Sequence, residues 1–267
     1  MFRALLILSL TLPACSRVPE SLTVELAPGV AMEFAYIPPG TFAMGAAPGE
    51  EGPLDDSETP QHQVELSRGF YLAKYELTQA QWRAVVGTQP WRRRQYVKEG
   101  AQHPATYISW IEAEHFIQRL NKKAGKTLYR FPTEAEWEYT CRAGTTTRWF
   151  SGDDEQTLVD YAWVSSNSWA VGEKYPHPVG QKAPNAWGLY DMHGNVWEWV
   201  ADWEGPYDSE KKIDPQGPAT GERRVGRGGS FGTLGLGGRS ASRFFSPPDA
   251  RSPDVGVRIA REVTTDQ

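Results

Sequence analysis

Two tryptophans, Trp197 and Trp199, mark the segment around which the hydrophobic pattern of the chain is organised. Apolar residues between positions 188 and 199 do not recur at helical spacing, and two glycines interrupt the segment, so we expect it to be non-helical. In an extended chain, residues two apart point to the same face. That face must be buried, because each indole ring carries a large apolar area. The sequence therefore predicts a core strand that packs against other aromatic residues.

Alternating apolar and polar positions predict further strands in the first third of the chain. Residues 32–37 alternate up to a Pro-Pro-Gly turn at 38–40, and residues 41–45 alternate again, which predicts two strands joined by a turn. Residues 63–66 and 69–72 form one strand with a kink or two separate strands. The acidic, Pro- and Gly-rich stretch 46–61 is typical of a surface loop, and its charge is interpreted as solvation rather than as a partner site.

Three helices are predicted from capping boxes, in which a hydroxyl at the N-cap and a Glu or Gln three residues later satisfy each other's backbone donors. The three boxes are Thr78 to Gln81, Ser109 to Glu112, and Thr133 to Glu136. We expect the first helix to bury Trp82, Val85 and Val86, the second Ala113, Phe116, Ile117 and Leu120, and the third Trp137. The acids Glu134, Glu136 and Glu138 are interpreted as charges that the helix dipole favours in the first turn.

Beyond residue 150 the chain is predicted to consist of loops and short strands, with no repeat and no linker. One domain of α+β class therefore accounts for the whole pattern. Of the 267 residues, 26 are glycine, 20 proline and 11 tryptophan, which suits a loop-rich domain. The net charge of −5 argues against nucleic-acid binding, and the short run Arg92-Arg93-Arg94 is interpreted as a solvated loop.

The first 14 residues resemble a bacterial lipoprotein signal peptide. Arg3 supplies the positive charge, residues 4–12 the short apolar run, and Cys15 the thiol that would be acylated. We expect residues 15–30 to be an anchor and spacer and residues 31–263 to be the folded domain. Because no aspartate follows Cys15, the expected location is the outer membrane, reached through a lipid anchor. An ordinary secretory signal is the alternative, and the apolar run is too short for a transmembrane helix.

Acylation of Cys15 would leave Cys141 as the remaining thiol, since the chain has two cysteines. No disulfide is then expected, even in an oxidising compartment. The fold must instead depend on packing and on a metal ion. Asp191 and Glu198, with turn carbonyls at Gly194 and Val196, are hard oxygen ligands of the kind that calcium prefers. The alternative is that these carboxylates cap turns.

Several ordered motifs give the chain a resemblance to the formylglycine-generating enzyme, or sulfatase-modifying factor, family over about residues 30 to 262. The motifs occupy residues 37–45, 75–78, 109–110, 131–138, 188–199 and 227–231. The resemblance implies a variant of the C-type lectin fold, with a small twisted antiparallel sheet and much irregular backbone. It also implies calcium at the Asp191, Gly194, Val196 and Glu198 set. A second calcium site of the family would need an asparagine at the position of Trp163, so it is not expected here.

Copper oxidation, which the resemblance would otherwise imply, is not expected. The oxidases of the family bind copper through two cysteines, and the matching positions in this chain are Thr233 and Gly238. Neither residue can supply the thiolate that copper selects. The five histidines show no paired metal-ligand spacing. Between residues 225 and 259 the only acids are Asp249 and Asp254, and no histidine, cysteine, lysine or tyrosine is present to act as base or nucleophile.

A non-catalytic binding role is the remaining interpretation, with an unknown protein or glycan as the ligand. The expected surface is made of Phe231, Thr233, Leu234, Leu236, Arg239, Ser240, Ser242, Phe244 and Phe245. We expect the arginines Arg239, Arg243, Arg251 and Arg258 to tie loops together rather than to hold an anionic ligand. The alternatives are an accessory factor of an envelope pathway such as type VI secretion, and an oxidase of the family with non-cysteine chemistry.

Overall fold

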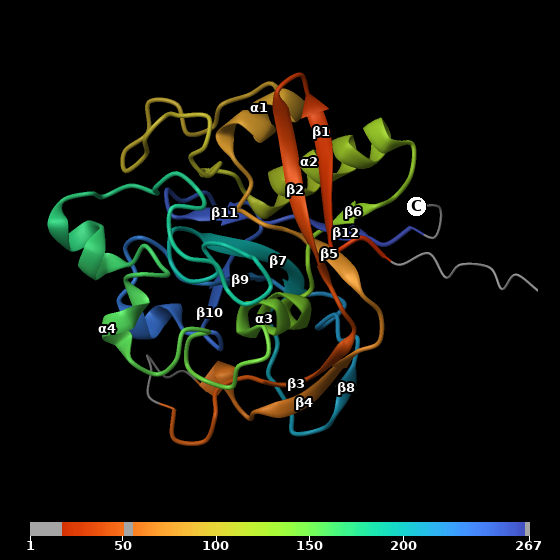
Figure 1. Ribbon diagram of the computed structural model, residues 1–267, viewed down its shortest axis with the longest axis vertical. Coiled ribbons are helices and arrows are strands. Elements are labelled where there is room, and N and C mark those ends of the chain that lie inside the picture. Colours follow the sequence, from red (N-terminus) through yellow and green to blue (C-terminus); the bar gives the residue numbers. More distant parts are fainter. Residues whose placement is uncertain (1–17, 51–55, 265–267) are drawn as a thin grey trace, which may run out of the picture.

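The computed structural model describes residues 18–50 and 56–264. In these residues the strands form three sheets and the helices are few (Figure 1). The predicted α+β class with irregular backbone is confirmed, although the strands divide among three sheets rather than one. No helix in the described ranges is long and apolar enough to cross a membrane. The expected signal peptide and the lipidation site Cys15 lie outside the described residues.

The largest sheet joins both ends of the described chain. Its strand order is β1-β2-β5-β12-β6, and all neighbours are antiparallel. The strands are β1 (Ser21–Ala27), β2 (Val30–Ile37), β5 (Phe70–Ala73), β12 (Ala260–Glu262) and β6 (Tyr129–Arg130). The expectation that residues 15–30 are a spacer is therefore wrong for 21–27. These residues form an edge strand that pairs with β2, and along it exposed and partly buried positions alternate.

This sheet is buried on both faces, because alternate residues of its inner strands enter two different cores. Phe34 and Tyr71 belong to a core with Trp82 and Phe116, whose rings stack at 5.6 Å. The neighbouring residues of β2 and β5 point the other way, into a second core around Trp137. The period of two along each strand thus separates the two cores.

Two smaller sheets complete the fold. The four-stranded sheet has the order β10-β9-β7-β11, with β11 parallel to β7. The three-stranded sheet has the order β3-β4-β8, with β8 parallel to β4. Their bounds are β3 (Gly40–Met44), β4 (His62–Leu66), β7 (Trp197–Trp203), β8 (Lys212–Ile213), β9 (Arg224–Arg227), β10 (Arg243–Ser246) and β11 (Val255–Val257). The stretches 63–66 and 69–72 are therefore two strands, in different sheets.

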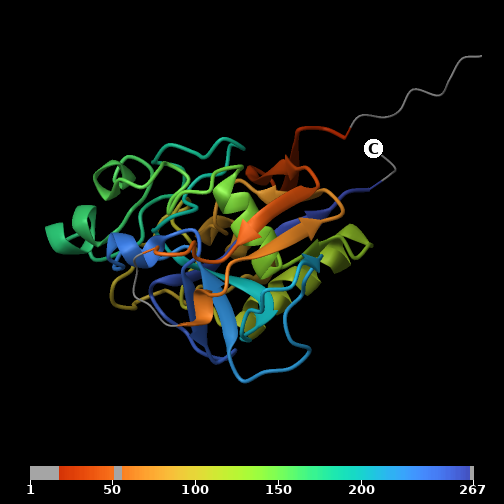
Figure 2. The ribbon, with the colours of Figure 1, turned by 90° about the horizontal axis from the view of Figure 1, so that it is seen from below.

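The three predicted helices begin at the predicted caps. They are α1 (Gln79–Val86), α2 (Trp110–Ala124) and α3 (Glu134–Arg142), and each shows both hydrogen bonds of its capping box. The short α4 (Glu155–Leu158) was not predicted. Trp82 is buried as expected, whereas Val85 and Val86 are only partly buried. Figures 1 and 2 show that α4 and the loops around it project away from the five-stranded sheet.

The tryptophan pair lies on β7 and packs against an aromatic ring, as predicted. Phe244 of β10 stacks on Trp197 with ring centroids 5.4 Å apart and contacts Trp199 at 6.1 Å. Trp199 is buried and Trp197 is partly buried. Both indoles lie on one face of the strand, so the alternation rule placed them correctly.

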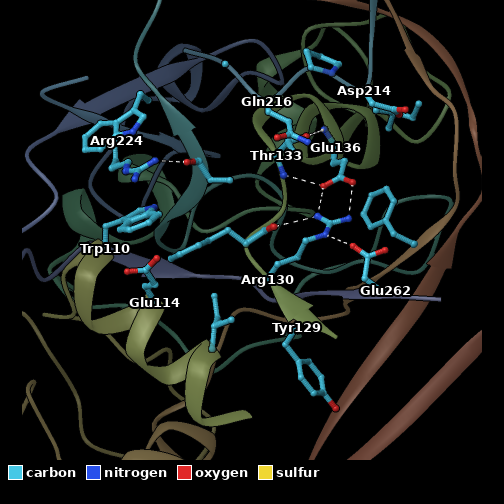
Figure 3. Close-up of a pocket in the computed structure, with 18 of the residues that line it drawn as sticks. Trp110, Glu114, Tyr129, Arg130, Thr133, Glu136, Asp214, Gln216, Arg224 and Glu262 are labelled. Atoms are coloured by element: carbon cyan, nitrogen blue, oxygen red, sulfur yellow. Dashed lines mark hydrogen bonds and ion pairs between the residues drawn. The ribbon is translucent and has the colours of Figure 1, made fainter. Parts of the chain in front are cut away.

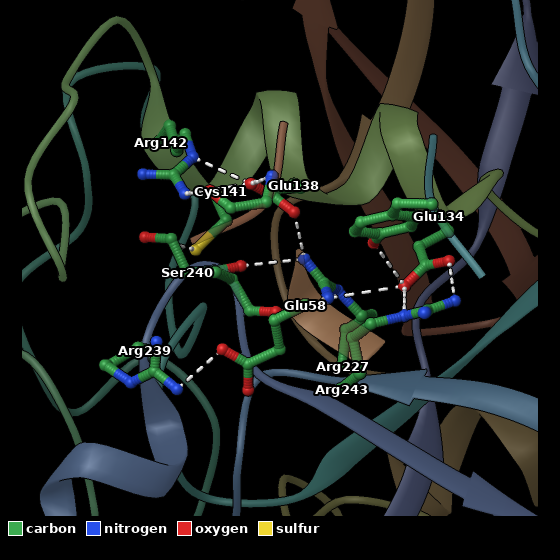
Figure 4. A network of polar contacts seen from close by, with 12 residues as sticks. Glu58, Glu134, Glu138, Cys141, Arg142, Arg227, Arg239, Ser240 and Arg243 are labelled. Carbon is green, nitrogen blue, oxygen red and sulfur yellow. Dashed lines mark hydrogen bonds and ion pairs between the residues drawn. The ribbon is translucent and has the colours of Figure 1, made fainter. Parts of the chain in front are cut away.

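Buried acids of α3 hold the segments around it together, a role that the expected interaction with the helix dipole did not include (Figure 4). Arg227 of β9 is fully buried and donates to Glu138 and, at 3.3 Å, to Glu134. Arg243 donates to both Glu134 oxygens at 2.7 and 2.9 Å. Arg142 donates to the second Glu138 oxygen at 2.9 Å, and that oxygen also accepts from the backbone of Gly45. Glu134 and Glu136 lie in the first turn, as predicted, whereas Glu138 lies beyond it.

Removal of the Arg227 guanidinium should cost far more stability than removal of an exposed one. We expect Arg227→Ala to lower the free energy of unfolding by about 3–5 kcal/mol, because two buried carboxylates lose their partner. The control Arg223→Ala breaks a pair with Glu204 in which the arginine is half exposed, and it should cost less than about 1 kcal/mol. Urea unfolding measures both values, and equal losses would contradict the assignment.

Candidate functional site

The central segment 188–199 turns sharply before β7 because its backbone visits the left-handed region. Asp191, Gly194 and Asn195 have φ values of 55°, 74° and 54°. At Gly194 a Cβ atom would lie 2.1 Å from the carbonyl oxygen of Trp163, so no other residue fits. Hydrogen bonds from Gly194 to Gly228 and from Phe231 to Asn195, both 2.8 Å long, fix this turn beside residues 228–231.

Three carboxylates and one arginine are buried together at this turn. Glu198 accepts from Arg258 at 2.6 and 3.0 Å and from the Trp137 indole at 2.6 Å. Glu76 accepts from the Asn195 side chain at 2.6 Å and from the Val196 backbone at 3.0 Å. Each of the three acids is about 1% exposed. Burial raises the pKa of Glu76, and the neighbouring acids Asp191 and Glu198 raise it further.

The charge of this cluster fits a divalent cation. Three acids, Glu76, Asp191 and Glu198, face one arginine, and burial raises the pKa of Asp191. One oxygen of Asp191 accepts from Gly180 at 2.7 Å, and the other has no hydrogen-bond partner among the described residues. Both Glu198 oxygens are engaged by Arg258, so an ion there would use their remaining lone pairs.

Glu76 is the member of this cluster that the sequence did not single out. It lies more than 100 residues before its partners, and only the motif at 75–78 marked its position. In the described ranges no three His, Cys, Asp or Glu side chains are placed to hold one ion together. The expected calcium site would not form a group of this kind, because only Asp191 and Glu198 would bind through side chains. Its other two ligands are the backbone carbonyls of Gly194 and Val196.

Aromatic stacking occupies the place where a second calcium ligand would be needed. The ring of Trp163 stacks on His177 at 3.7 Å, and the Lys182 ammonium lies 4.1 Å from the Trp163 ring centroid. His177 is buried, which lowers its pKa to about 4, so the imidazole is neutral at pH 7. The stack joins the segments around residues 163 and 177.

The two positions of the copper cysteines do not fit a copper ion. The Thr233 hydroxyl lies 3.0 Å from the Ser230 hydroxyl and accepts from the Ser230 backbone. Gly238 has no side chain, and its backbone packs against Gly229 so closely that a Cβ at Gly229 would lie 2.8 Å from it. Neither position offers the soft ligand that copper requires.

Four residues of the expected binding surface are buried, so they cannot contact a ligand. Phe231, Arg239, Ser240 and Ser242 are each at most 2% exposed. Arg239 donates to Glu50 and, at 2.7 Å, to Glu58, both from the loop that was expected to be merely solvated. That acidic loop is therefore a structural partner of the 231–242 segment. The expectation that arginines tie loops together is correct here and for Arg258, Arg243 and Arg251.

The remaining expected surface residues divide between two places. Phe244 and Phe245 are partly buried on β10, where Phe244 packs against the tryptophans of β7. Thr233 and Leu236 are partly buried, and Leu234 is 74% exposed. The exposed part of the predicted surface is therefore centred on Leu234.

Leu234 lies on one of three exposed segments that aromatic contacts hold together and that the sequence did not associate. Trp169 stacks on Phe231 at 6.0 Å and contacts Tyr96 at 5.1 Å, which joins three distant segments. Of the five large hydrophobic side chains that are exposed in the described part of the chain, three lie on these segments: Tyr96, Val171 and Leu234. We call Tyr96, Trp169, Val171 and Leu234 the aromatic face.

Basic side chains flank the aromatic face, although the whole chain is acidic. The run Arg92-Arg93-Arg94 and Lys98 are exposed on the segment that carries Tyr96. Lys174 is exposed, and its ammonium lies 4.9 Å from the Trp169 ring centroid. The arginine run is solvated as expected, but its position beside an apolar surface gives that surface a positive rim.

Comparison with known proteins agrees with the motifs. Residues 23–263 match the model of the sulfatase-modifying factor enzyme 1-like domain. A formylglycine-generating enzyme of Streptomyces coelicolor is 32% identical over 289 residues, covering 85% of this chain and 88% of that enzyme.

Two solved structures share the fold over nearly the whole chain. Treponema denticola variable protein 1 is 27% identical, has a TM-score of 0.81 and covers 92% of this chain and 100% of its own. PvdO from Pseudomonas aeruginosa is 28% identical, has a TM-score of 0.77 and covers 93% of this chain and 100% of its own. The chain thus belongs to the formylglycine-generating enzyme (sulfatase-modifying factor) family, with that family's variant of the C-type lectin fold.

Proposed function

We propose that this chain is a non-catalytic binding protein, anchored by lipid in a bacterial envelope, that holds a partner protein on its aromatic face. One observation carries this proposal. Leu234 of the face lies between Thr233 and Gly238, the positions that match the copper cysteines of the family's oxidases, and Trp169 of the face stacks on Phe231, two residues before Thr233. An exposed apolar surface therefore takes the place of the reacting thiols.

Loss of oxidation follows from the side chains that remain. Copper(I) is held by thiolates, and Thr233 and Gly238 supply none. Cys141 cannot replace them, because burial raises the pKa of its thiol to about 12 and its sulfur is fully enclosed. It contacts the carbonyl of Met192 at 3.6 Å, inside the second core.

A protein partner with an acidic surface suits the aromatic face. Tyr and Trp side chains are enriched at the centres of protein interfaces, where they bury a large area. The arginines 92–94, with Lys98 and Lys174, form a positive rim that would attract acidic groups and speed their association. Glu99 and Glu173 are the acids nearest in sequence, and the exposed Glu155 carboxylate lies against Gly235, next to Leu234. The five basic side chains outnumber these three acids, so the rim keeps a net positive charge.

The proposal also includes a lipid anchor at Cys15 and a calcium ion beside Asp191. Acylation of Cys15 would tether the domain through the segment that precedes β1, with the outer membrane as the expected location. A calcium ion at Asp191 and Glu198, with the carbonyls of Gly194 and Val196, would offset the excess negative charge of the buried cluster. Its role would be structural, since it would hold the turn that leads into β7.

Copper and oxygen measurements test the loss of catalysis. With copper and a sulfatase-type cysteine peptide, we expect the purified protein to retain no copper and to consume no oxygen, whereas the Streptomyces coelicolor enzyme serves as the active control. The double variant Thr233→Cys with Gly238→Cys restores both thiols, and we expect it to retain copper. Stoichiometric copper or peptide oxidation by the unmodified protein would refute the proposal.

Calcium should stabilise the protein through Asp191. At a calcium concentration one hundred times its dissociation constant, we expect the unfolding temperature to rise by about 5–10 °C. In chelator, Asp191→Asn should be at least as stable as the unmodified protein, because it removes a buried charge that lacks compensation. Added calcium should then raise the unfolding temperature of the Asp191→Asn variant very little. The exposed control Asp249→Asn should respond like the unmodified protein, and an equal gain in Asp191→Asn would exclude this site.

Site-specific photo-crosslinking in the producing cells tests the aromatic face. A photo-reactive residue at Leu234 and one at Val171 should capture the same partner. The same residue at Ile213, which is 60% exposed on β8, should not. Leu234→Asp should weaken binding of the captured partner at least tenfold, and added salt should weaken it further because of the basic rim. Capture from Ile213 alone, or from none of the three positions, would contradict the proposal.

A further inference from the structure

Figure 3 shows a cleft that none of the residues of the aromatic face lines. This cleft has a volume of about 780 Å³, which is within the range of small-molecule sites. It is bounded by the first turns of α2, the edge strand β6, the end of β7 and the loop 214–219. Aromatic rings and charged or amide side chains alternate along its wall.

One wall of the cleft is a stack in which a guanidinium lies between two indoles. The Phe131 ring stacks on Trp110 at 4.7 Å, and the Arg224 guanidinium lies 3.7 Å from the Trp110 ring centroid and 3.5 Å from that of Trp203. Trp110 is nearly buried, whereas Trp203 is partly exposed. Stacking of this kind fixes the position of the arginine without using its hydrogen-bond donors.

The donors of Arg224 are largely unused. One terminal nitrogen donates to the carbonyl of Ala201, and Nε has no partner in the described part of the chain but is enclosed by the protein. Burial lowers the pKa of Arg224 even though Glu114 and Asp202 oppose that change. An arginine stays charged in a protein, so the wall presents a cation whose terminal N–H groups are the donors that a ligand can reach.

At the other end of the cleft the arginines face carboxylates. Arg130 is bound by Glu136 at 2.6 Å and by Glu262 at 2.5 Å, so its charge is satisfied on two sides. The exposed Arg68 also lines that end, and its charge acts on Asp214, which lines the same end. A ligand that enters the cleft therefore meets an arginine without an ion pair among the described residues at the Arg224 end and compensated arginines at the Arg130 end. That asymmetry favours a ligand with one carboxylate or similar acidic group at the Arg224 end.

The backbone around the cleft excludes a peptide that would add as a strand. Asn121 of α2 takes the free edge of β6, since it accepts from Leu128 and Tyr129 and donates to the Tyr129 carbonyl. The Pro132 carbonyl accepts from Ala201. An extended peptide thus finds no row of open backbone groups. The side chains Gln118, Gln216 and Glu114 instead offer the mixed donors and acceptors that hydroxyl groups use.

We propose that this cleft binds a short acidic oligosaccharide, with a sugar carboxylate on Arg224 and a sugar ring against the exposed part of Trp203. The carboxylate would meet the terminal N–H groups of the stacked guanidinium. The hydroxyl groups would exchange hydrogen bonds with the amides and acids of the rim. This site is independent of the partner surface proposed above.

Isothermal titration of the full chain with tetragalacturonate and with its methyl ester tests this proposal. We expect saturable binding of the acid and at least tenfold weaker binding of the ester. Arg224→Gln should weaken binding of the acid at least tenfold. The matched control Arg223→Gln changes the adjacent arginine, which pairs with Glu204 outside the cleft, and should leave the affinity unchanged.

A second variant keeps the test decisive if Arg224→Gln fails to fold. Glu114→Gln changes a partly exposed side chain and removes a negative charge beside Arg224, so it should strengthen binding of the acid two- to fivefold. Glucuronate and N-acetylmuramate oligosaccharides extend the series. Equal binding of acid and ester, no saturable binding in any series, or preferential binding of a carboxy-terminal peptide would overturn the proposal.

Discussion

Fully buried arginines, each held by carboxylates from a distant segment, are the constraint on which this fold depends. Arg227, Arg239 and Arg258 have no exposed surface, and each crosses more than 50 residues of sequence to reach its acid. Such pairs contribute little net free energy, because desolvation offsets attraction. They do penalise every arrangement in which one partner is left alone. A loop-rich chain whose one described cysteine is free obtains a unique arrangement of its loops in this way.

Local chemistry made parts of this fold predictable from the sequence. The three capping boxes predicted the starts of α1, α2 and α3, because the two hydrogen bonds of a box form within four residues. The alternation of apolar and polar residues, which is also a short-range pattern, predicted β2, β3 and the shared face of Trp197 and Trp199. β1 carries the same alternation, with Leu22, Val24 and Leu26 on one face, and was missed because the segment was interpreted as a spacer after the lipid anchor.

Side chains whose environment depends on distant residues were not predictable. Arg239, Ser240 and Ser242 belong to polar types that usually lie on the surface, yet the acids Glu50 and Glu58 make burial of this segment possible. Glu76 was missed at the candidate metal site because its partners come from residues 195–196. The aromatic face was missed because Trp169 joins segments that are far apart in sequence.

The position of β12 has a consequence for how the chain is made. This last strand lies between β5 and β6 rather than at an edge, and its residues pair with both neighbours. Until it arrives, the two strands beside it have unpaired backbone groups and the sheet has a gap in its middle. Residues up to 262 must therefore leave the ribosome before the sheet can close, so β5 and β6 wait for a strand that is made long after β5. Deletion of residues 260–262 would remove an interior strand and leave two open edges inside the core.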